Sequence, residues 1–236
     1  MDQRPFFFKR FALFHHRSTM KIGTDAILLG RWVDVNGDDE VLDIGTGCGL
    51  LPLMLAQKGI KSADAVEIDQ DSFEEAAQNF SNSAWKSRLF AVNDDIKHYA
   101  ELCTKKYDLV VSNPPFFFGD NIPEKEKKGL ARHTNTLSYN DLLISVKQLL
   151  KPDGRFALVL PARESLTFLK DAENQGFFLK KEMKIVPIEG KEPNRINMQL
   201  VVNQVGRVES ETFVLRHPDH SFTKEYKEFL KDYYLD

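Results

Sequence analysis

The sequence predicts an α/β fold: a doubly wound, mostly parallel seven-stranded sheet with an antiparallel hairpin at one edge. From residue 40 onward, short runs rich in β-branched residues alternate with runs of helical periodicity, as in βαβ units. A glycine-rich stretch at residues 45–49 follows the first of these runs and would turn the chain into a helix. The last two strand-like runs have no helix between them long enough for a crossover, which favours an antiparallel pair.

The individual elements follow from apolar periodicity and from the turn residues that separate them. Thr24 or Asp25 is a candidate N-cap for a first short helix at Ala26–Trp32. We expect one domain over residues 1–236, because no internal repeat or low-complexity linker divides the chain. Strands are expected near 40–45, 63–68, 88–92, 107–112, 154–160, 177–187 and 196–206, and later helices near 50–58, 71–82, 139–151, 162–175 and 222–233.

Composition indicates a cytoplasmic protein; the sequence leaves the oligomeric state open, with a monomer favoured. The net charge of −3 argues against a protein that coats nucleic acid, although a local basic patch is compatible with it. The two cysteines, Cys48 and Cys103, are too few for a disulfide framework or a cysteine zinc site, and we predict no metal. Apolar runs fall short of the roughly 20 residues that span a bilayer, and charges interrupt the aromatic N-terminus, so neither a membrane span nor a signal peptide is expected.

Residues 1–22 form an aromatic and basic extension. One interpretation is a strand or hairpin whose phenylalanines pack on the main domain, and the other is an edge that contacts RNA through cations and stacking. The residues concerned are Phe6, Phe7, Phe8, Phe11 and Phe14, interleaved with Lys9, Arg10, His15, His16, Arg17 and Lys21.

The glycine-rich stretch favours one cofactor over others. A dinucleotide fingerprint requires a third glycine where Leu50 stands, and a P-loop requires a Gly-Lys-Ser/Thr ending that is absent. The remaining pattern, Asp-x-Gly-x-Gly-x-Gly, is a loop that binds S-adenosyl-L-methionine; the alternative is a tight turn without a ligand. Its candidate cofactor-binding residues are Asp43, Gly45, Gly47 and Gly49.

Further candidates stand at the ends of the next two strands. Glu67 could accept both hydroxyls of a ribose, and Ile68 beside it could cover one face of an adenine. Asp95, followed by Ile96, could accept a hydrogen bond from the amino group of the cofactor. Each acid alone is more often a helix cap or a surface residue. Their order after the glycine loop nevertheless predicts a cofactor site.

The candidate catalytic residues are Asn113, Pro114 and Phe116, in the sequence Asn-Pro-Pro-Phe after the strand at 107–112. Two prolines end the strand and stiffen the backbone, so the Asn113 side-chain oxygen and the Pro114 carbonyl could both accept from one planar NH2 group. Phe116 would stack on the ring that bears the amine. Such a site would work by positioning and electrostatics, without a base held in a triad. The alternative is a proline-rich strand exit with a buried phenylalanine.

Asp43–Gly49 together with Asn113–Phe116 resembles the class I methyltransferases that modify planar nitrogens, over about residues 20–160. The resemblance implies a Rossmann-like fold, S-adenosyl-L-methionine as methyl donor and the Asn-Pro-Pro-Phe motif as the site of the target nitrogen. Enzymes with this motif act on DNA adenine, rRNA guanine, tRNA adenine or protein glutamine.

Other segments narrow the resemblance to the valine-tRNA (adenine-37-N6)-methyltransferases. Met20–Gly30, preceded by Phe-x-Lys-x-Phe, is similar to their N-terminal signature, and Ala131–His133, Leu137–Ser138 and Leu142–Leu143 to the segment after their catalytic motif. The glutamine enzymes carry an N-terminal helical domain for which this chain has no room. Phe116 departs from the family, where many members have tyrosine, and the tail after residue 207 carries little that matches it.

The resemblance implies methyl transfer from S-adenosyl-L-methionine to N6 of adenine-37 in the anticodon loop of a valine tRNA. The alternatives are another planar nitrogen (protein glutamine, DNA adenine or an rRNA base) and a cofactor-binding scaffold without catalysis. Residues 119–135 are interpreted as a mobile loop that closes over substrate or as a solvated charge run. The candidate RNA contacts are Lys9, Arg10, Arg17, Lys21, Lys125, Lys127, Lys128, Arg132, Lys180, Lys181, Lys184, Lys191 and Arg195.

Overall fold

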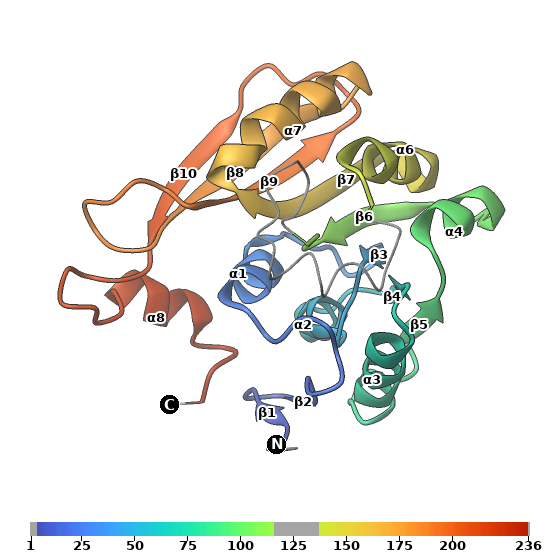
Figure 1. Ribbon diagram of the computed structural model, residues 1–236, viewed down its shortest axis with the longest axis horizontal. Coiled ribbons are helices and arrows are strands. Elements are labelled where there is room, and N and C mark those ends of the chain that lie inside the picture. Colours follow the sequence, from blue (N-terminus) through green and yellow to red (C-terminus); the bar gives the residue numbers. More distant parts are fainter. Residues whose placement is uncertain (1–3, 116–136, 236) are drawn as a thin grey trace, which may run out of the picture.

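A computed structural model describes residues 4–115 and 137–235 and confirms the predicted fold class (Figure 1). The main sheet has the order β10-β8-β9-β7-β6-β3-β4-β5, in which β9 runs antiparallel to both of its neighbours and the remaining pairs are parallel. Its strands are β3 (Glu40–Ile44), β4 (Ser62–Glu67), β5 (Leu89–Asn93), β6 (Tyr107–Ser112), β7 (Leu150–Pro161), β8 (Phe178–Val186), β9 (Arg195–Val201) and β10 (Glu209–Val214).

The sheet has eight strands where the sequence predicted seven. The expected strand at 196–206 ends at Val201, and β10 then adds an edge strand parallel to β8. The antiparallel pair β8–β9 therefore lies inside the sheet, one strand from the edge. β10 escaped prediction because it has the polar sequence Glu-Ser-Glu-Thr-Phe-Val and only its last two residues are partly buried.

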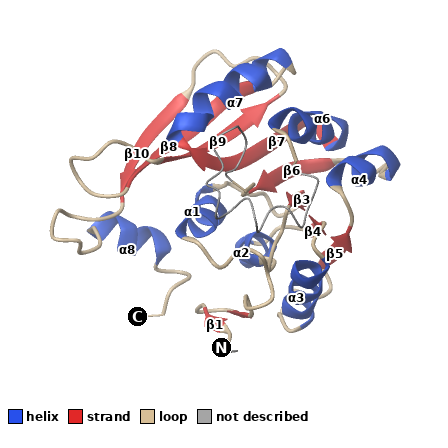
Figure 2. Ribbon diagram, viewed as in Figure 1, coloured by secondary structure: helices blue, strands red, loops and turns tan. Residues whose placement is uncertain are grey.

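Helices cover both faces of the sheet (Figure 2). Apolar side chains of α1, α2, α3 and α8 join one core cluster, and those of α4, α6 and α7 join the other. The sequence did not predict the short helix α4. The bounds are α1 (Thr24–Trp32), α2 (Leu50–Lys58), α3 (Gln70–Ser81), α4 (Ile96–Leu102), α6 (Tyr139–Leu149), α7 (Ala162–Asn174) and α8 (Lys224–Leu230).

The prediction that Thr24 or Asp25 caps α1 is wrong. Gly23 occupies the N-cap position without a side-chain hydrogen bond, and both predicted caps lie in the first turn. Asp25 instead accepts a hydrogen bond from Arg195 Nε at 2.9 Å, which ties the start of α1 to the start of β9.

The N-terminal extension packs as a hairpin on the main domain. β1 (Phe6–Phe7) pairs antiparallel with β2 (Ala12–Leu13). Between them, the rings of Phe8 and Phe11 are buried and stacked with centroids 4.5 Å apart. The packed hairpin is therefore confirmed for residues 4–13, although Phe6 and Phe7 of β1 are both exposed.

The strand register aligns the carboxyl ends of four strands. Ile44 of β3 is level with Val66 of β4 and with Ser112 of β6, and Glu67 is level with Asn93 of β5. Residues that follow these strands consequently meet along one edge of the sheet, where open α/β sheets bind ligands. No helix in the two described ranges is both long enough and apolar enough to cross a membrane.

Candidate active site

The glycine loop after β3 leaves open space at two of its glycines. Gly45, Gly47 and Gly49 have φ values of 72°, 56° and 85°, a region that disfavours side chains. A Cβ atom added at Gly45 or Gly47 would meet no atom of the described chain within 4 Å. One added at Gly49 would lie 2.5 Å from Phe80 Cε1. The first two glycines thus leave room for a ligand, whereas the third permits close packing of α2 against α3.

This difference predicts that two alanine substitutions affect stability and cofactor binding to different extents. Gly49→Ala should destabilise the protein by about 2–4 kcal/mol, since a steric clash in the core adds to the strain of a positive φ. Gly47→Ala adds only the strain of the positive φ and should lower stability by about 1–2 kcal/mol. It should weaken cofactor binding more than Gly49→Ala does. Chemical denaturation and calorimetric titration with S-adenosyl-L-methionine would measure both. Equal stability losses would contradict the distinction.

Glu67 is buried at the end of β4 and is joined to the glycine loop. Its Oε2 accepts the Gly47 backbone N–H at 2.8 Å, and its Oε1 accepts the Asp69 N–H at 2.9 Å. Burial raises the pKa of Glu67 although these two bonds favour the charged form. The carboxylate keeps lone pairs for further donors, which suits the two hydroxyls of a ribose. Ile68 beside it is an exposed apolar side chain, available to cover a flat ring.

The two predicted residues after β5, Asp95 and Ile96, lie in different surroundings. Asp95 caps α4, because its Oδ1 accepts the Lys97 N–H at 2.8 Å, and it is only partly buried. Ile96 is buried in one of the two core clusters. The sequence did not single out Asn93, whose side chain donates to the Glu67 carbonyl at 2.9 Å and so fixes the β4 end relative to β5.

Asp43, on β3, is a fully buried carboxyl. Neither of its oxygens forms a hydrogen bond of good geometry with the described part of the chain, although the Thr46 hydroxyl lies close enough to favour the charged form. Burial raises the pKa of Asp43 to about 7; the Thr46 hydroxyl opposes this rise, and the negative charge of Glu67 adds to it. A carboxyl in this position would be stabilised as the anion by a cationic ligand.

Asn113 presents an unpaired acceptor at the end of β6. Its Oδ1 is buried and accepts no hydrogen bond from any described residue. Ser112 fixes the strand end through its hydroxyl, which donates to the Ile44 carbonyl at 2.9 Å just before the glycine loop. Pro114 is buried beside Asn113. Phe116 and the loop at 119–135 lie outside the described residues.

The acceptors and the open space at this edge fit S-adenosyl-L-methionine. Open space at two loop glycines, unpaired acceptors at Asp43 and Asn113, and the Glu67 carboxylate all lie along one sheet edge. The cofactor offers complementary groups: a cationic sulfonium and ammonium, and two ribose hydroxyls. The tight-turn alternative without a ligand gives no reason for buried acceptors that lack donors.

Several basic residues nominated for RNA contact are engaged within the protein. Arg17 pairs with Asp71 and Glu74, Lys181 with Asp34, Lys184 with Glu182, and Arg195 with Asp25. Lys21 donates to two backbone carbonyls. Lys180 and Lys181 also lie near the start of β8, away from the edge where the site forms, because β8 runs in the same direction as β7. The nominated residues 125, 127, 128 and 132 lie outside the described ranges.

Comparison with known proteins identifies relatives along the whole chain. The Methyltransferase small domain model matches residues 13–172. A tRNA1(Val) (adenine(37)-N6)-methyltransferase of Trichodesmium erythraeum is 39% identical, with 100% of this chain and 99% of the relative covered. Proteins of the same name from Tolumonas auensis and Parabacteroides distasonis are 37% and 36% identical, with at least 98% of each chain covered.

Solved structures share the fold at low sequence identity. A predicted O-methyltransferase, Atu636 of Agrobacterium tumefaciens, has a TM-score of 0.68 at 16% identity, with 89% of this chain and 96% of that chain covered. The glycopeptide N-methyltransferase MtfA, solved with S-adenosyl-L-methionine, has a TM-score of 0.54 at 14% identity, with 78% and 100% covered. These two structures support the Rossmann-like fold.

Proposed function

This chain belongs to the tRNA1(Val) (adenine(37)-N6)-methyltransferase family, and on that basis we propose that it methylates N6 of adenine-37 in the anticodon loop of a valine tRNA. It is an S-adenosyl-L-methionine-dependent enzyme with a tRNA substrate. The observation that carries the proposal at the site is the buried, unpaired Oδ1 of Asn113 beside the glycine loop.

Each site residue has a distinct proposed role. Glu67 accepts the ribose hydroxyls of the cofactor, Ile68 covers its adenine, and Asp95 accepts from the amino group of that adenine. Gly45 and Gly47 leave space for its amino-acid part. When bound, S-adenosyl-L-methionine supplies an electrophilic methyl group on a positively charged sulfur.

Asn113 and Pro114 are proposed to activate the target amine by accepting hydrogen bonds from it. The amine of adenine is a weak nucleophile, since its lone pair is delocalised into the ring. If its two N–H groups donate hydrogen bonds to the Asn113 Oδ1 and the Pro114 carbonyl, the nitrogen is favoured in a pyramidal form with a directed lone pair. The methylated nitrogen is acidic enough to lose its proton to water, so no protein base is required. A base in an unpaired loop also flips out at a lower cost than one in a duplex.

The experiment is incubation of the protein with methyl-labelled S-adenosyl-L-methionine and total tRNA, followed by nuclease digestion and mass identification of the labelled nucleoside. N6-methyladenosine is the expected product. Label on guanosine, or label that survives nuclease and is lost with protease, would contradict the proposal and indicate another planar nitrogen.

A further inference from the structure

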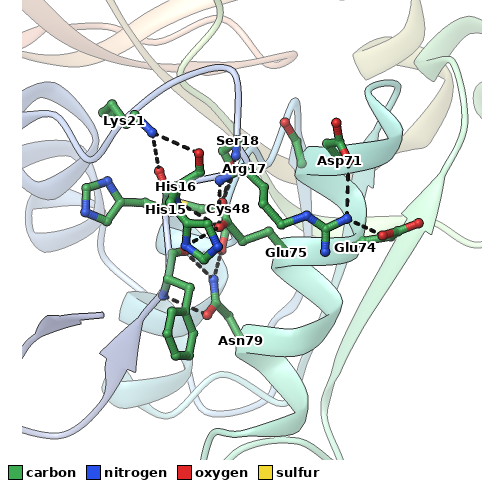
Figure 3. Close-up of polar contacts among 12 residues, drawn as sticks. His15, His16, Arg17, Ser18, Lys21, Cys48, Asp71, Glu74, Glu75 and Asn79 are labelled. Carbon is green, nitrogen blue, oxygen red and sulfur yellow. Dashed lines mark hydrogen bonds and ion pairs between the residues drawn. The ribbon is translucent and has the colours of Figure 1, made fainter. Parts of the chain in front are cut away.

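The residues between the N-terminal hairpin and α1 lie across helix α3, beside the glycine loop (Figure 3). We call Phe14–Thr19 the N-terminal segment. It has no regular secondary structure, so its backbone groups need partners outside a helix or sheet. Two buried polar side chains of α3, Glu75 and Asn79, supply most of these partners.

Glu75 binds three consecutive backbone N–H groups. Its Oε1 accepts from His16 and Arg17 at 2.9 Å each. Its Oε2 accepts from the Ser18 backbone at 2.8 Å and from the Ser18 hydroxyl at 2.6 Å. Burial alone would raise the pKa of Glu75, but these hydrogen bonds outweigh it and hold the pKa below its usual range. The carboxylate is therefore charged at neutral pH, and its bonds are of the strong, charge-assisted kind.

Asn79 links the N-terminal segment directly to the glycine loop. Its Oδ1 accepts the Phe14 N–H at 2.9 Å, and its Nδ2 donates to the Phe14 carbonyl at 2.8 Å. The same Nδ2 also donates to the carbonyl of Cys48 at 2.8 Å. Cys48 stands between Gly47 and Gly49, so one buried amide fixes both the segment and the loop.

A second series of hydrogen bonds runs from the segment to Glu67. The Thr19 N–H donates to the Ser72 hydroxyl at 3.2 Å, and this hydroxyl donates to Asp69 at 2.7 Å. The Asp69 N–H then donates to Glu67, the carboxylate that also holds Gly47. The segment is thus connected to the cofactor site at two points.

We propose that Glu75 and Asn79 are positioning residues for cofactor binding: they hold the N-terminal segment on α3, and the segment in turn fixes the glycine loop and Glu67. This inference rests on the proposed role of the loop and Glu67 in binding S-adenosyl-L-methionine. The anchoring is specific to the buried side chains, because the neighbouring Glu74 pairs with Arg17 at the surface, where ion pairs contribute little.

The test compares Glu75→Gln with Glu74→Gln. Both substitutions remove one charge from the same helix and alter a contact to the N-terminal segment. An amide in place of the Glu75 carboxylate offers one acceptor oxygen instead of two and sets an NH2 group against the segment's donors. Calorimetric titration with S-adenosyl-L-methionine, at a temperature where all variants are folded, should give a dissociation constant about tenfold higher for Glu75→Gln and within about twofold of wild type for Glu74→Gln.

Two further measurements separate positioning from general stability. Amide hydrogen exchange should accelerate at residues 16–18 in Glu75→Gln, and the KM for S-adenosyl-L-methionine should rise while kcat at saturation stays close to wild type. Ser18→Ala removes only one of the four hydrogen bonds to the carboxylate and should give a smaller effect in the same direction; it serves as the test if Glu75→Gln does not fold.

Unchanged cofactor affinity in a folded Glu75→Gln variant would overturn the inference. If Glu75→Gln does not fold, unchanged affinity in Ser18→Ala would overturn it. Unchanged exchange at residues 16–18 would overturn it as well. Wild-type protein that fails to bind S-adenosyl-L-methionine would instead contradict the proposed role of the site, so the two failures are distinguishable.

Discussion

Asn113→Ala is expected to lower kcat for tRNA methylation by about 100-fold or more, the effect of removing one preorganised hydrogen-bonding group from a transition state. The Oδ1 of Asn113 is buried and has no partner in the described chain, so the substitution removes the acceptor that we propose for the amine. The affinity for S-adenosyl-L-methionine should stay within about threefold of wild type, since the glycine loop and Glu67 are untouched.

Asn113→Asp is the matched variant, because it keeps an acceptor oxygen at the same position. It should retain more activity than Asn113→Ala under the same conditions. Single-turnover methylation of saturating tRNA, measured beside calorimetric titration of the cofactor, gives both quantities. Turnover near the wild-type value in Asn113→Ala would contradict the role of this side chain, as would a parallel loss of cofactor binding.

Asp43→Asn is expected to stabilise the cofactor-free protein at pH 8 while weakening cofactor binding at least tenfold. The pKa of Asp43 is raised by burial to about 7, so folding favours its protonated form. Its contribution to stability is present below the ordinary aspartate pKa of about 4 and is lost as pH rises through about 7. An asparagine stays neutral and removes this loss, so the variant's advantage in unfolding temperature should grow from about pH 4 to about pH 7 and level off above that.

The affinity for the cofactor should depend on pH in the opposite direction to stability. A cationic ligand stabilises the Asp43 anion, so wild-type affinity should rise with pH toward a plateau above 7, and the wild-type to variant ratio should increase over the same range. Thermal unfolding with and without S-adenosyl-L-methionine measures both effects. A pH-independent ratio would contradict the pairing of Asp43 with the cationic cofactor. A less stable Asp43→Asn at pH 8 would contradict the raised pKa of the buried carboxyl.

The sequence predicted the parts of the fold in which local pattern and tertiary role agree. β3 and β6 are apolar strands at the sheet centre, and each ends at a breaker, Gly45 or Pro114, that also belongs to the site. β10 and α4 escaped prediction for the opposite reason. β10 is a polar edge strand, and α4 has seven residues, of which only Ile96 and Ala100 are buried.

The anchoring of the N-terminal segment was also beyond prediction. Glu75 and Asn79 lie on a helix with charged neighbours, where a glutamate and an asparagine normally face solvent. They are buried by a segment that lies 59 to 65 residues away in sequence. A single sequence holds no signal for that contact. The same reasoning applies to Arg17 and Lys181, whose acidic partners on other elements could not be anticipated.

We propose that the site directs a methyl group to one amine, N6 of adenine-37. The most direct test is methylation of two valine-tRNA transcripts, one with adenine at position 37 and one with guanine there. We expect N6-methyladenosine at position 37 in the first transcript and no incorporation into the second. Equal incorporation into both transcripts, or methylation at another position of the first, would contradict the proposed target.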